Sequence, residues 1–440
     1  MTMNRSTVAP AAASLPPEDP AFLKAVTELA KRRPVVTSRA IHNLQGIKLL
    51  EGGVVIDEGL YERLLSHRLS RPLDESLSGD TALNGAALVQ AAEAAMERWP
   101  FFALMGQAGR VRSMLLEAVK AIPLPAPVVF HLTLARETRT SLFDHSILMA
   151  LLSAHLVREG GASIQDITMA AAAGLLHDLG MLHIDAELLE AGNRLNGDER
   201  RPLYVHPVTS SMLIARFHEY PKQVPRAILE HHEMLDGSGY PRGLEGQAIS
   251  PLGRLLSLAE VVTAMFDGER QYPEQRVSLL LRMNPKRYDE SLVPSIYRLL
   301  GALPRPAEAP GVDAAEVVDR LGLHAGLLDQ WREVVAAVLP QADGDAAVLL
   351  ESVSEQAETL QRVLFEAGIT ADQLVMFTGG APLSPGLTVD LWALAQELQW
   401  NLRATANQLQ RRWRSGGGGR PIPPELGLWL DDVNALDLHS

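Results

Sequence analysis

The residues with the clearest capacity for chemistry are histidines and carboxylates spread over positions 145 to 260. Imidazole nitrogens and carboxylate oxygens are the ligands that hold divalent metals in a helical pocket. The chain contains no cysteine, which excludes thiolate metal sites and cysteine nucleophiles. We single out the set His145, His177, Asp178, His206, His231, His232 and Glu260 as candidate ligands of two metals.

Taken singly, these histidines have ordinary explanations. A His-Asp doublet is common by chance, although His177-Asp178 ends an apolar stretch, where buried polar atoms need a partner. His145 could be an ordinary helix residue, and His206 could begin a helix before Pro207. Adjacent histidines on a helix point about 100° apart. The pair at 231 and 232 could therefore serve one metal each.

Glu260 also has a structural explanation. It falls in a polar stripe at helical spacing that could simply face water, formed by Arg254, Ser257, Glu260, Thr263 and Asp267. The metal hypothesis therefore depends on the complete set and not on any single member.

The segment that follows the histidine pair is more specific. It reads HHEMLDGSGYP over residues 231–241, and Arg242-Gly243-Leu244 and a helix carrying Glu260 come next. With the order His, His-Asp, His, His-His and carboxylate, residues 127–304 resemble the HD-GYP family of metal-dependent phosphohydrolases. The resemblance implies an all-α fold, an HD-superfamily helical bundle, and hydrolysis of cyclic di-GMP to pGpG and/or GMP.

The resemblance also assigns roles to individual residues. The seven residues above become ligands of two divalent ions, iron or manganese, with Asp178 as the bridging carboxylate. Asp178 and His177 would act in catalysis through the bound metals. Two metals held close together activate a water and clamp phosphoryl oxygens, so a protein nucleophile is not required.

Three positions depart from the family pattern. Met181 stands where the family has a lysine that meets a substrate phosphate, and His183 could replace part of that function. Glu260 is one methylene longer than the usual aspartate. Ser141 stands where some relatives have a glutamate for a third metal, so we expect two metals.

Further substrate contacts are implied by the loop and by a downstream basic residue. Gly237 and Gly239 permit positive φ and Pro241 stiffens the exit, so the turn can present Tyr240. Arg270 lies near the place of a phosphate-binding residue of the family. In the family this loop has been linked to contact with GGDEF-domain diguanylate cyclases.

The composition predicts a helical protein to position these residues. Hydrophobic residues make up 47% of the 440 residues and aromatic residues only 5%, and Leu and Ala dominate. The net charge of −13 argues against nucleic-acid binding. We find no run of about 18 apolar residues, predict no membrane span and expect a cytoplasmic protein.

Proline-rich connectors predict four parts of the chain. Residues 1–20 read as a disordered tail, 21–125 as a mostly helical regulatory region, 126–304 as the HD-GYP domain and 311–440 as a helical C-terminal region. The N-terminal region is expected to contain a small hairpin made by 45–50 and 54–56. Helices are predicted at 21–33, 57–69, 82–99, 101–122, 138–159, 163–177, 207–219, 221–234, 251–266, 273–283 and 291–303, with a loop at 70–80.

The flanking regions leave functional alternatives open. Residues 401–414 place several arginines near Trp413, namely Arg403, Arg411, Arg412 and Arg414. We interpret this stretch as a solvated face with an aromatic anchor, and a docking helix for a partner is the alternative. Homodimerisation stays open. Alternatives to cyclic di-GMP hydrolysis are a weakened module that only binds ligand and a phosphohydrolase for another cyclic dinucleotide.

Overall fold

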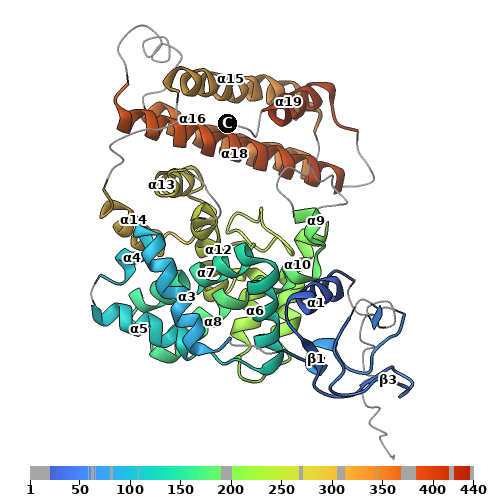
Figure 1. The fold of residues 1–440 in the computed structure, drawn as a ribbon. Helices are drawn as coiled ribbons and strands as arrows, with labels where there is room; N and C mark the ends of the chain where they lie inside the picture. Colours follow the sequence, from blue (N-terminus) through green and yellow to red (C-terminus); the bar gives the residue numbers. More distant parts are fainter. Residues whose placement is uncertain are drawn as a thin grey trace, which may run out of the picture.

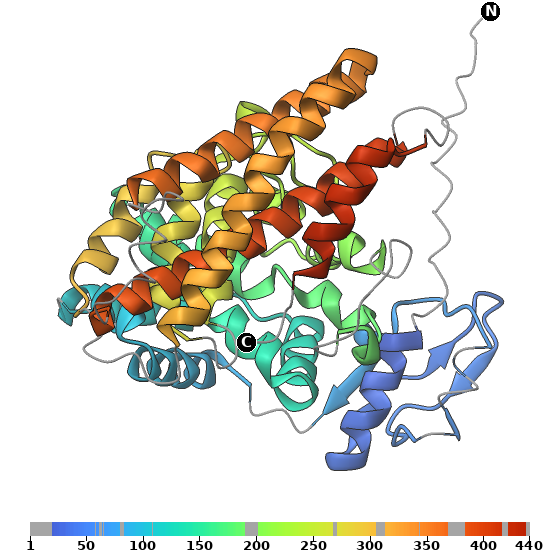
Figure 2. The same cartoon turned by 90° about the horizontal axis from the view of Figure 1, so that it is seen from above.

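The structure, a computed structural model, is built almost entirely from helices arranged in two layers (Figures 1 and 2). It describes residues 20–57, 59–60, 64, 66–79, 83–107, 109–189, 201–266, 271–304, 313–342, 344–367, 383–415 and 421–436. The predicted tail and Arg270 lie outside these residues. The all-α fold class predicted from the composition and the motif is confirmed.

The N-terminal region begins with the predicted helix, α1 (Pro20–Arg32). Two small antiparallel pairs follow, β1 (Val35–Thr37) with β4 (Leu77–Gly79) and β2 (Ile41–His42) with β3 (Lys48–Leu50). The predicted hairpin was wrong, because β3 pairs with the strand before it. The carboxamide oxygen of Asn43 accepts hydrogen bonds from the backbone N–H groups of Gln45 and Ile47, and these bonds close the turn there.

Two further predictions for this region were also imperfect. The predicted helix 57–69 lies partly outside the described residues, and its last described residues are not helical, since Leu69 pairs with Asn43. The predicted loop 70–80 contains the 3-10 turn η1 (Leu73–Ser76) and the strand β4.

Four helices lead from this region into the bundle. They are α3 (Gly85–Arg98), α4 (Pro100–Met105), α5 (Gly109–Lys120) and α6 (Ala126–Thr138). The predicted helix 101–122 is therefore two helices. The helix α6 was missed because its prolines suggested a connector. Pro127 lies in the first helical turn, where its missing N–H group costs no hydrogen bond.

The central bundle surrounds two apolar helices, α7 (Thr140–Glu159) and α8 (Ile164–Leu176). Every residue from Ile167 to Leu176 is buried, as predicted from a run that is apolar apart from Thr168. The other elements are η2 (Leu179–His183), α9 (Ala186–Leu189), α10 (Arg201–Ile214), α11 (Gln223–Glu230), η3 (Gly246–Ala248), α12 (Pro251–Thr263), η4 (Ala264–Phe266), α13 (Pro273–Met283) and α14 (Val293–Gly301). The helix α10 begins before the predicted residue, with Pro207 inside it.

The helix α7 is long and apolar enough to cross a membrane by length and composition alone. Most of its residues are buried within the structure, where it packs against α8. One hydrophobic core extends from Phe22 to Leu299 and joins the N-terminal helices to the bundle.

A second core holds the C-terminal helices together. These are α15 (Ala314–Val338), the short η5 (Leu339–Gln341), α16 (Gly344–Glu366), α18 (Pro385–Ser415) and α19 (Pro424–Ala435). Figure 1 shows them as a layer above the bundle, where α18 packs on α13. A buried ion pair links these two helices, with Arg276 Nε 2.6 Å from Glu397 Oε1.

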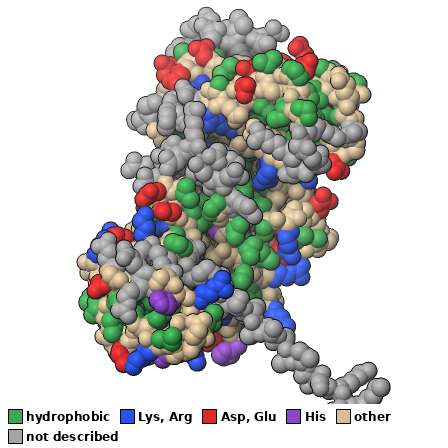
Figure 3. Space-filling model, turned by 90° about the vertical axis from the view of Figure 1, so that its right-hand side faces the viewer, with side chains coloured by type: hydrophobic (Ala, Val, Ile, Leu, Met, Phe, Trp, Pro, Cys, Tyr) green, Lys and Arg blue, Asp and Glu red, His purple; other side chains and the backbone are tan. Residues whose placement is uncertain are grey.

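Charged side chains of both signs are interspersed on the face drawn in Figure 3. Histidine shows mainly in the lower half of this view.

Candidate metal centre

The structure brings the seven singled-out side chains together at the centre of the bundle. They come from the helices α7, α10 and α12 and from the segments that follow α8 and α11. Two groups of donors form, Asp178 with His206, His231 and His232, and Asp178 with His145 and His177. Asp178 belongs to both groups, as a bridging carboxylate must.

The two oxygens of Asp178 face different groups. Oδ1 lies 3.0 Å from His206 Nε2 and 3.6 Å from His231 Nε2. Oδ2 lies 3.4 Å from His177 Nε2. The Asp178 carboxylate therefore separates the two groups and can contribute an oxygen to each.

Glu260 joins the group that contains His145 and His177. Its Oε2 lies 3.0 Å from His145 Nε2 and 3.3 Å from His177 Nε2. The side chain of Glu260, one methylene longer than the expected aspartate, thus still reaches the two histidines of its group. The polar stripe of α12 does not face only water, because Ser257 donates to the carbonyl of Glu233 and Thr263 is buried.

Backbone carbonyls orient three of the imidazoles. Nδ1 of His177 hydrogen-bonds the carbonyl of Gly174, Nδ1 of His206 that of Leu203, and Nδ1 of His231 that of Ile228. In a neutral imidazole, an Nδ1 that donates to a carbonyl leaves Nε2 without a proton and able to bind a metal.

This tautomer has a consequence inside the site. His206 Nε2 and His231 Nε2 lie 3.2 Å apart, so two lone pairs face each other when both rings donate through Nδ1 and are neutral. Within the described residues, His177 Nε2 and Asp178 Oδ1 are buried without a hydrogen-bond partner. Buried polar atoms without a hydrogen bond destabilise the folded state unless another charged or polar group compensates them. The residues fit a pair of divalent cations. Such cations would bind the facing imidazole nitrogens and would compensate the buried atoms that lack a hydrogen bond.

The neighbouring rings of His231 and His232 belong to the same group, so the expectation of one metal each was wrong. The helix α11 ends at Glu230, and the pair follows its C-terminus. The angular offset of a regular helix therefore does not separate them, and the ring centroids lie 4.2 Å apart.

The electrostatics favour ionised carboxylates. Burial opposes ionisation of Asp178, but His177 and His206 hold its pKa well below the usual value. Burial likewise opposes ionisation of Glu260, and His145 and His177 lower its pKa well below the usual value. An ionised carboxylate is the form that binds a metal.

The imidazoles divide into two kinds. Burial lowers the pKa of His231 and, together with the neighbouring His231 and His206, lowers that of His232 well below its usual value. Burial also disfavours the charged form of His177, but Asp178 and Glu260 outweigh it and raise its pKa to about 9. A cation must therefore compete with a proton at His177, whereas the rings of His231 and His232 are neutral.

Gly180 sets the position of Asp178 beside α10. A Cβ atom at Gly180 would lie 2.4 Å from the carbonyl oxygen of His206. The N–H of Gly180 donates to Ser210 Oγ at 2.7 Å. Only glycine permits this approach, which explains its place two residues after the aspartate.

The Gly-Tyr-Pro loop is held against the metal centre. Gly237 has a φ of +73°, as predicted, whereas Gly239 is needed for close packing, because a Cβ there would lie 2.4 Å from His232 O. Tyr240 is presented inward and stacks on His232, with ring centroids 4.5 Å apart. Burial raises the pKa of the Tyr240 phenol well above its usual value.

The structure does not bring His183 to the metal centre. Its ring stacks on Phe22 with centroids 4.7 Å apart and lies near His131. Burial lowers its pKa to about 3, so the ring is neutral and cannot replace a lysine. The expectation for His183 was wrong. Met181 belongs to η2, where the guanidinium of Arg139 donates to its backbone carbonyl.

Sequence reasoning missed the residues that support the loop. The carboxylate of Glu233 accepts the N–H groups of Arg242 and Leu244, each at 2.8 Å. Glu230 is fully buried and accepts hydrogen bonds from Arg242 and from the N–H of Ser250. Two glutamates that flank a histidine pair, with Arg226 one helical turn before Glu230, were the available signal.

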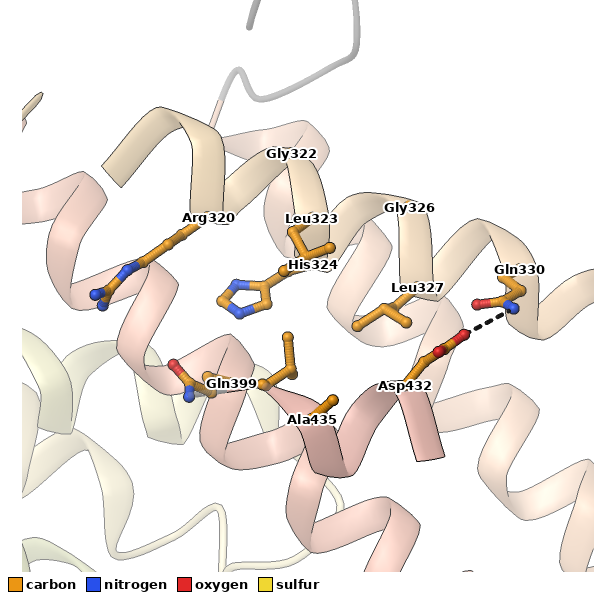
Figure 4. A pocket seen from close by; sticks show the side chains of 11 residues that line it. Arg320, Gly322, Leu323, His324, Gly326, Leu327, Gln330, Gln399, Asp432 and Ala435 are labelled. Carbon is orange, nitrogen blue, oxygen red and sulfur yellow. Dashed lines mark hydrogen bonds between the residues drawn. The ribbon is translucent and has the colours of Figure 1, made fainter. Parts of the chain in front are cut away.

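A cavity of about 700 Å³ lies elsewhere, between α15, α18 and α19 (Figure 4). His324, Gln399 and Asp432 contribute to its mostly apolar lining, and Asp432 is hydrogen-bonded to Gln330. None of the seven converging residues lines it. The candidate chemistry therefore lies at the metal centre and not in this cavity.

Comparison with known proteins agrees with the geometry. Residues 131–292 match the model of the HD domain family. This range contains all seven converging residues together with the Gly-Tyr-Pro loop. The chain carries an HD domain. Helices α7, α10 and α12 and the segments after α8 and α11 carry its seven converging residues.

Curated relatives match part of the chain. The 3'3'-cGAMP-specific phosphodiesterase 1 of Vibrio cholerae is 37% identical over 123 residues, 28% of each chain. A cyclic di-GMP phosphodiesterase of Pseudomonas aeruginosa is 28% identical over 185 residues, 41% of this chain and 45% of the relative. The chain thus spans less than half the length of these relatives.

A solved structure is also similar at a low level. It is an HDG"Y"P protein from Bdellovibrio bacteriovorus, 15% identical, with a TM-score of 0.36. The match covers 61% of this chain and 94% of that chain.

Proposed function

We propose that this chain is a metal-dependent phosphodiesterase that opens cyclic di-GMP to pGpG and/or GMP with two divalent cations, iron or manganese. The observation that supports it most strongly is the convergence of seven donor side chains around the shared carboxylate of Asp178. The activities named for the relatives are of the same class, hydrolysis of a cyclic dinucleotide.

Each residue of the two donor groups has a role in the proposed reaction. His145, His177 and Glu260 would hold one cation, and His206, His231 and His232 the other. Cations at both positions would polarise a phosphoryl oxygen and supply an activated water. Asp178 keeps the two positions close together, and the carbonyls of Gly174, Leu203 and Ile228 keep the imidazoles aimed inward. Tyr240 covers His232 and would border the bound substrate.

A second candidate substrate is 3'3'-cGAMP. The relative with 37% identity is named for that dinucleotide, whereas the relative from Pseudomonas aeruginosa is named for cyclic di-GMP. The two molecules share a ring closed by two phosphodiester bonds, which a metal-activated water would hydrolyse, and they differ in one base.

Metal analysis combined with a hydrolysis assay tests the proposal. We expect the protein, purified without a metal-binding tag, to contain close to two iron or manganese ions per chain. Chromatography should show linear products from cyclic di-GMP. His218→Ala is the matched control, because the side chain of His218 is 95% exposed and should leave both results unchanged.

Three other outcomes would contradict the proposal in different ways. Bound metal with saturable ligand binding but no product would favour a regulatory module. Hydrolysis of 3'3'-cGAMP without hydrolysis of cyclic di-GMP would change the substrate. Failure to bind any transition metal would refute the metal mechanism altogether.

Replacing Met181 with lysine is expected to raise activity. A lysine at this position would restore a cation toward the substrate phosphate, and a charge-assisted hydrogen bond contributes about 1.5–3 kcal/mol. Turnover or affinity should therefore rise roughly tenfold or more. Met181→Gln, which adds no charge, is the control. An unchanged or lower rate for the lysine variant would show that the site does not use a cation there.

A further inference from the structure

The C-terminal helix α18 reaches the side of the metal centre through Arg411. The guanidinium carbon of Arg411 lies 5.1 Å from the centroid of the Tyr204 ring. Tyr204 contacts Tyr240 edge to face, with centroids 4.8 Å apart, and Tyr240 stacks on His232. A continuous series of side chains thus connects a helix of the second core to a candidate metal ligand.

The position of Arg411 is set by a regular helix. The buried pair Arg276–Glu397 fixes the middle of α18 on α13. Arg411 follows about four turns further along α18, which corresponds to roughly 20 Å. Figure 1 shows α18 passing over the bundle toward the side where α9 and α10 lie. A side chain on such a helix is better positioned than one on a surface loop.

The charge of Arg411 acts on the loop that borders the metal centre. The Arg411 guanidinium lies 5.1 Å from the centroid of the Tyr204 ring, and the centroids of Tyr204 and Tyr240 lie 4.8 Å apart. The guanidinium therefore lies within electrostatic reach of the Tyr240 phenol. A phosphate bound beside Tyr240 would experience the same field.

The packing places a positive charge beside the tyrosines that border the centre. The guanidinium of Arg411 lies over the ring of Tyr204, and Tyr204 contacts Tyr240. Arg242 donates to the buried carboxylate of Glu230, and Arg139 donates to the backbone carbonyl of Met181 in η2. Met181 itself offers no positive charge.

We infer that Arg411 binds the second phosphate of a cyclic dinucleotide, the one that the metal pair does not hold. This inference rests on the proposed function. A cyclic dinucleotide carries two phosphodiester groups, and a metal pair that clamps one leaves the other at the border of the site. The planar guanidinium matches a phosphate with two parallel hydrogen bonds. The C-terminal helices then complete the substrate site of the HD domain.

Arg411→Gln tests the inference, because glutamine keeps part of the stem and removes the charge. We expect the KM for cyclic di-GMP to rise roughly tenfold or more, with a smaller change in kcat. Calorimetric binding of cyclic di-GMP to chelator-treated protein should weaken by a similar factor. Arg412→Gln is the matched control, since Arg412 is the next residue and is exposed.

A substrate with a single phosphate separates binding from a structural role. Hydrolysis of bis(p-nitrophenyl) phosphate should fall much less in Arg411→Gln than hydrolysis of cyclic di-GMP, and Arg411→Lys should recover part of the affinity for cyclic di-GMP. Equal losses on both substrates, or an unchanged KM and binding constant for cyclic di-GMP, would overturn the inference. Failure of the wild-type protein to bind or hydrolyse a cyclic dinucleotide would instead refute the proposed function, and the inference with it.

Discussion

Asp178→Asn is expected to lower phosphodiesterase turnover by about a thousandfold or more. The substitution preserves size but removes the only carboxylate common to both donor groups among the described residues. A metal pair supplies several kcal/mol of transition-state stabilisation. Losing about 4 kcal/mol of it corresponds to a factor of about 10³ in rate. Metal analysis should show at most one ion per chain.

The control for this variant lies on α8, the helix that ends shortly before Asp178. Asp166 is an exposed residue in the first turn of α8, and its carboxylate only accepts a hydrogen bond from Ser163 Oγ at 2.7 Å. Asp166→Asn should keep two metals and wild-type turnover. Asp178→Asn protein that retained both metals and turned over at the wild-type rate would show that Asp178 does not bridge.

The sequence was most informative where local pattern and tertiary burial agree. The apolar run Ile167–Leu176 predicted a buried helix, and the His-Asp pair at its end predicted a polar centre beside it. The helix α13 was predicted with its observed bounds, because Pro273 marks the first turn and periodic apolar residues follow. The motif identified the seven donors before any distance was available.

The sequence was least informative where the outcome depends on distant partners. The strand β4 is formed only because β1 pairs with it across some forty residues. The placement of His183 against Phe22 depends on where α1 packs, which local pattern does not contain. For the same reason residues 401–414 were interpreted as a solvated face, whereas Arg411 contacts Tyr204 of the bundle. Such contacts join residues separated by many helices.

Removing the metals is expected to lower the thermal stability of the HD domain. Without a cation, nothing separates the facing Nε2 atoms of His206 and His231, and the buried Oδ1 of Asp178 accepts no hydrogen bond. A ligand present at about a thousand times its Kd stabilises the folded state by about 4 kcal/mol. For a domain of this size that corresponds to a change in Tm of roughly 10 °C.

Scanning calorimetry with and without a chelator measures this difference, and metal analysis checks that the ions have been removed. Adding manganese or iron back should restore the Tm. The Asp178→Asn variant makes the test specific, because its Tm should respond much less to the chelator than the wild-type Tm. If the wild-type protein lost its metals without any change in Tm, the seven side chains would be packed stably without cations. The cost assigned to the His206–His231 contact would then be wrong, and the convergence would have to be explained by hydrogen bonds alone.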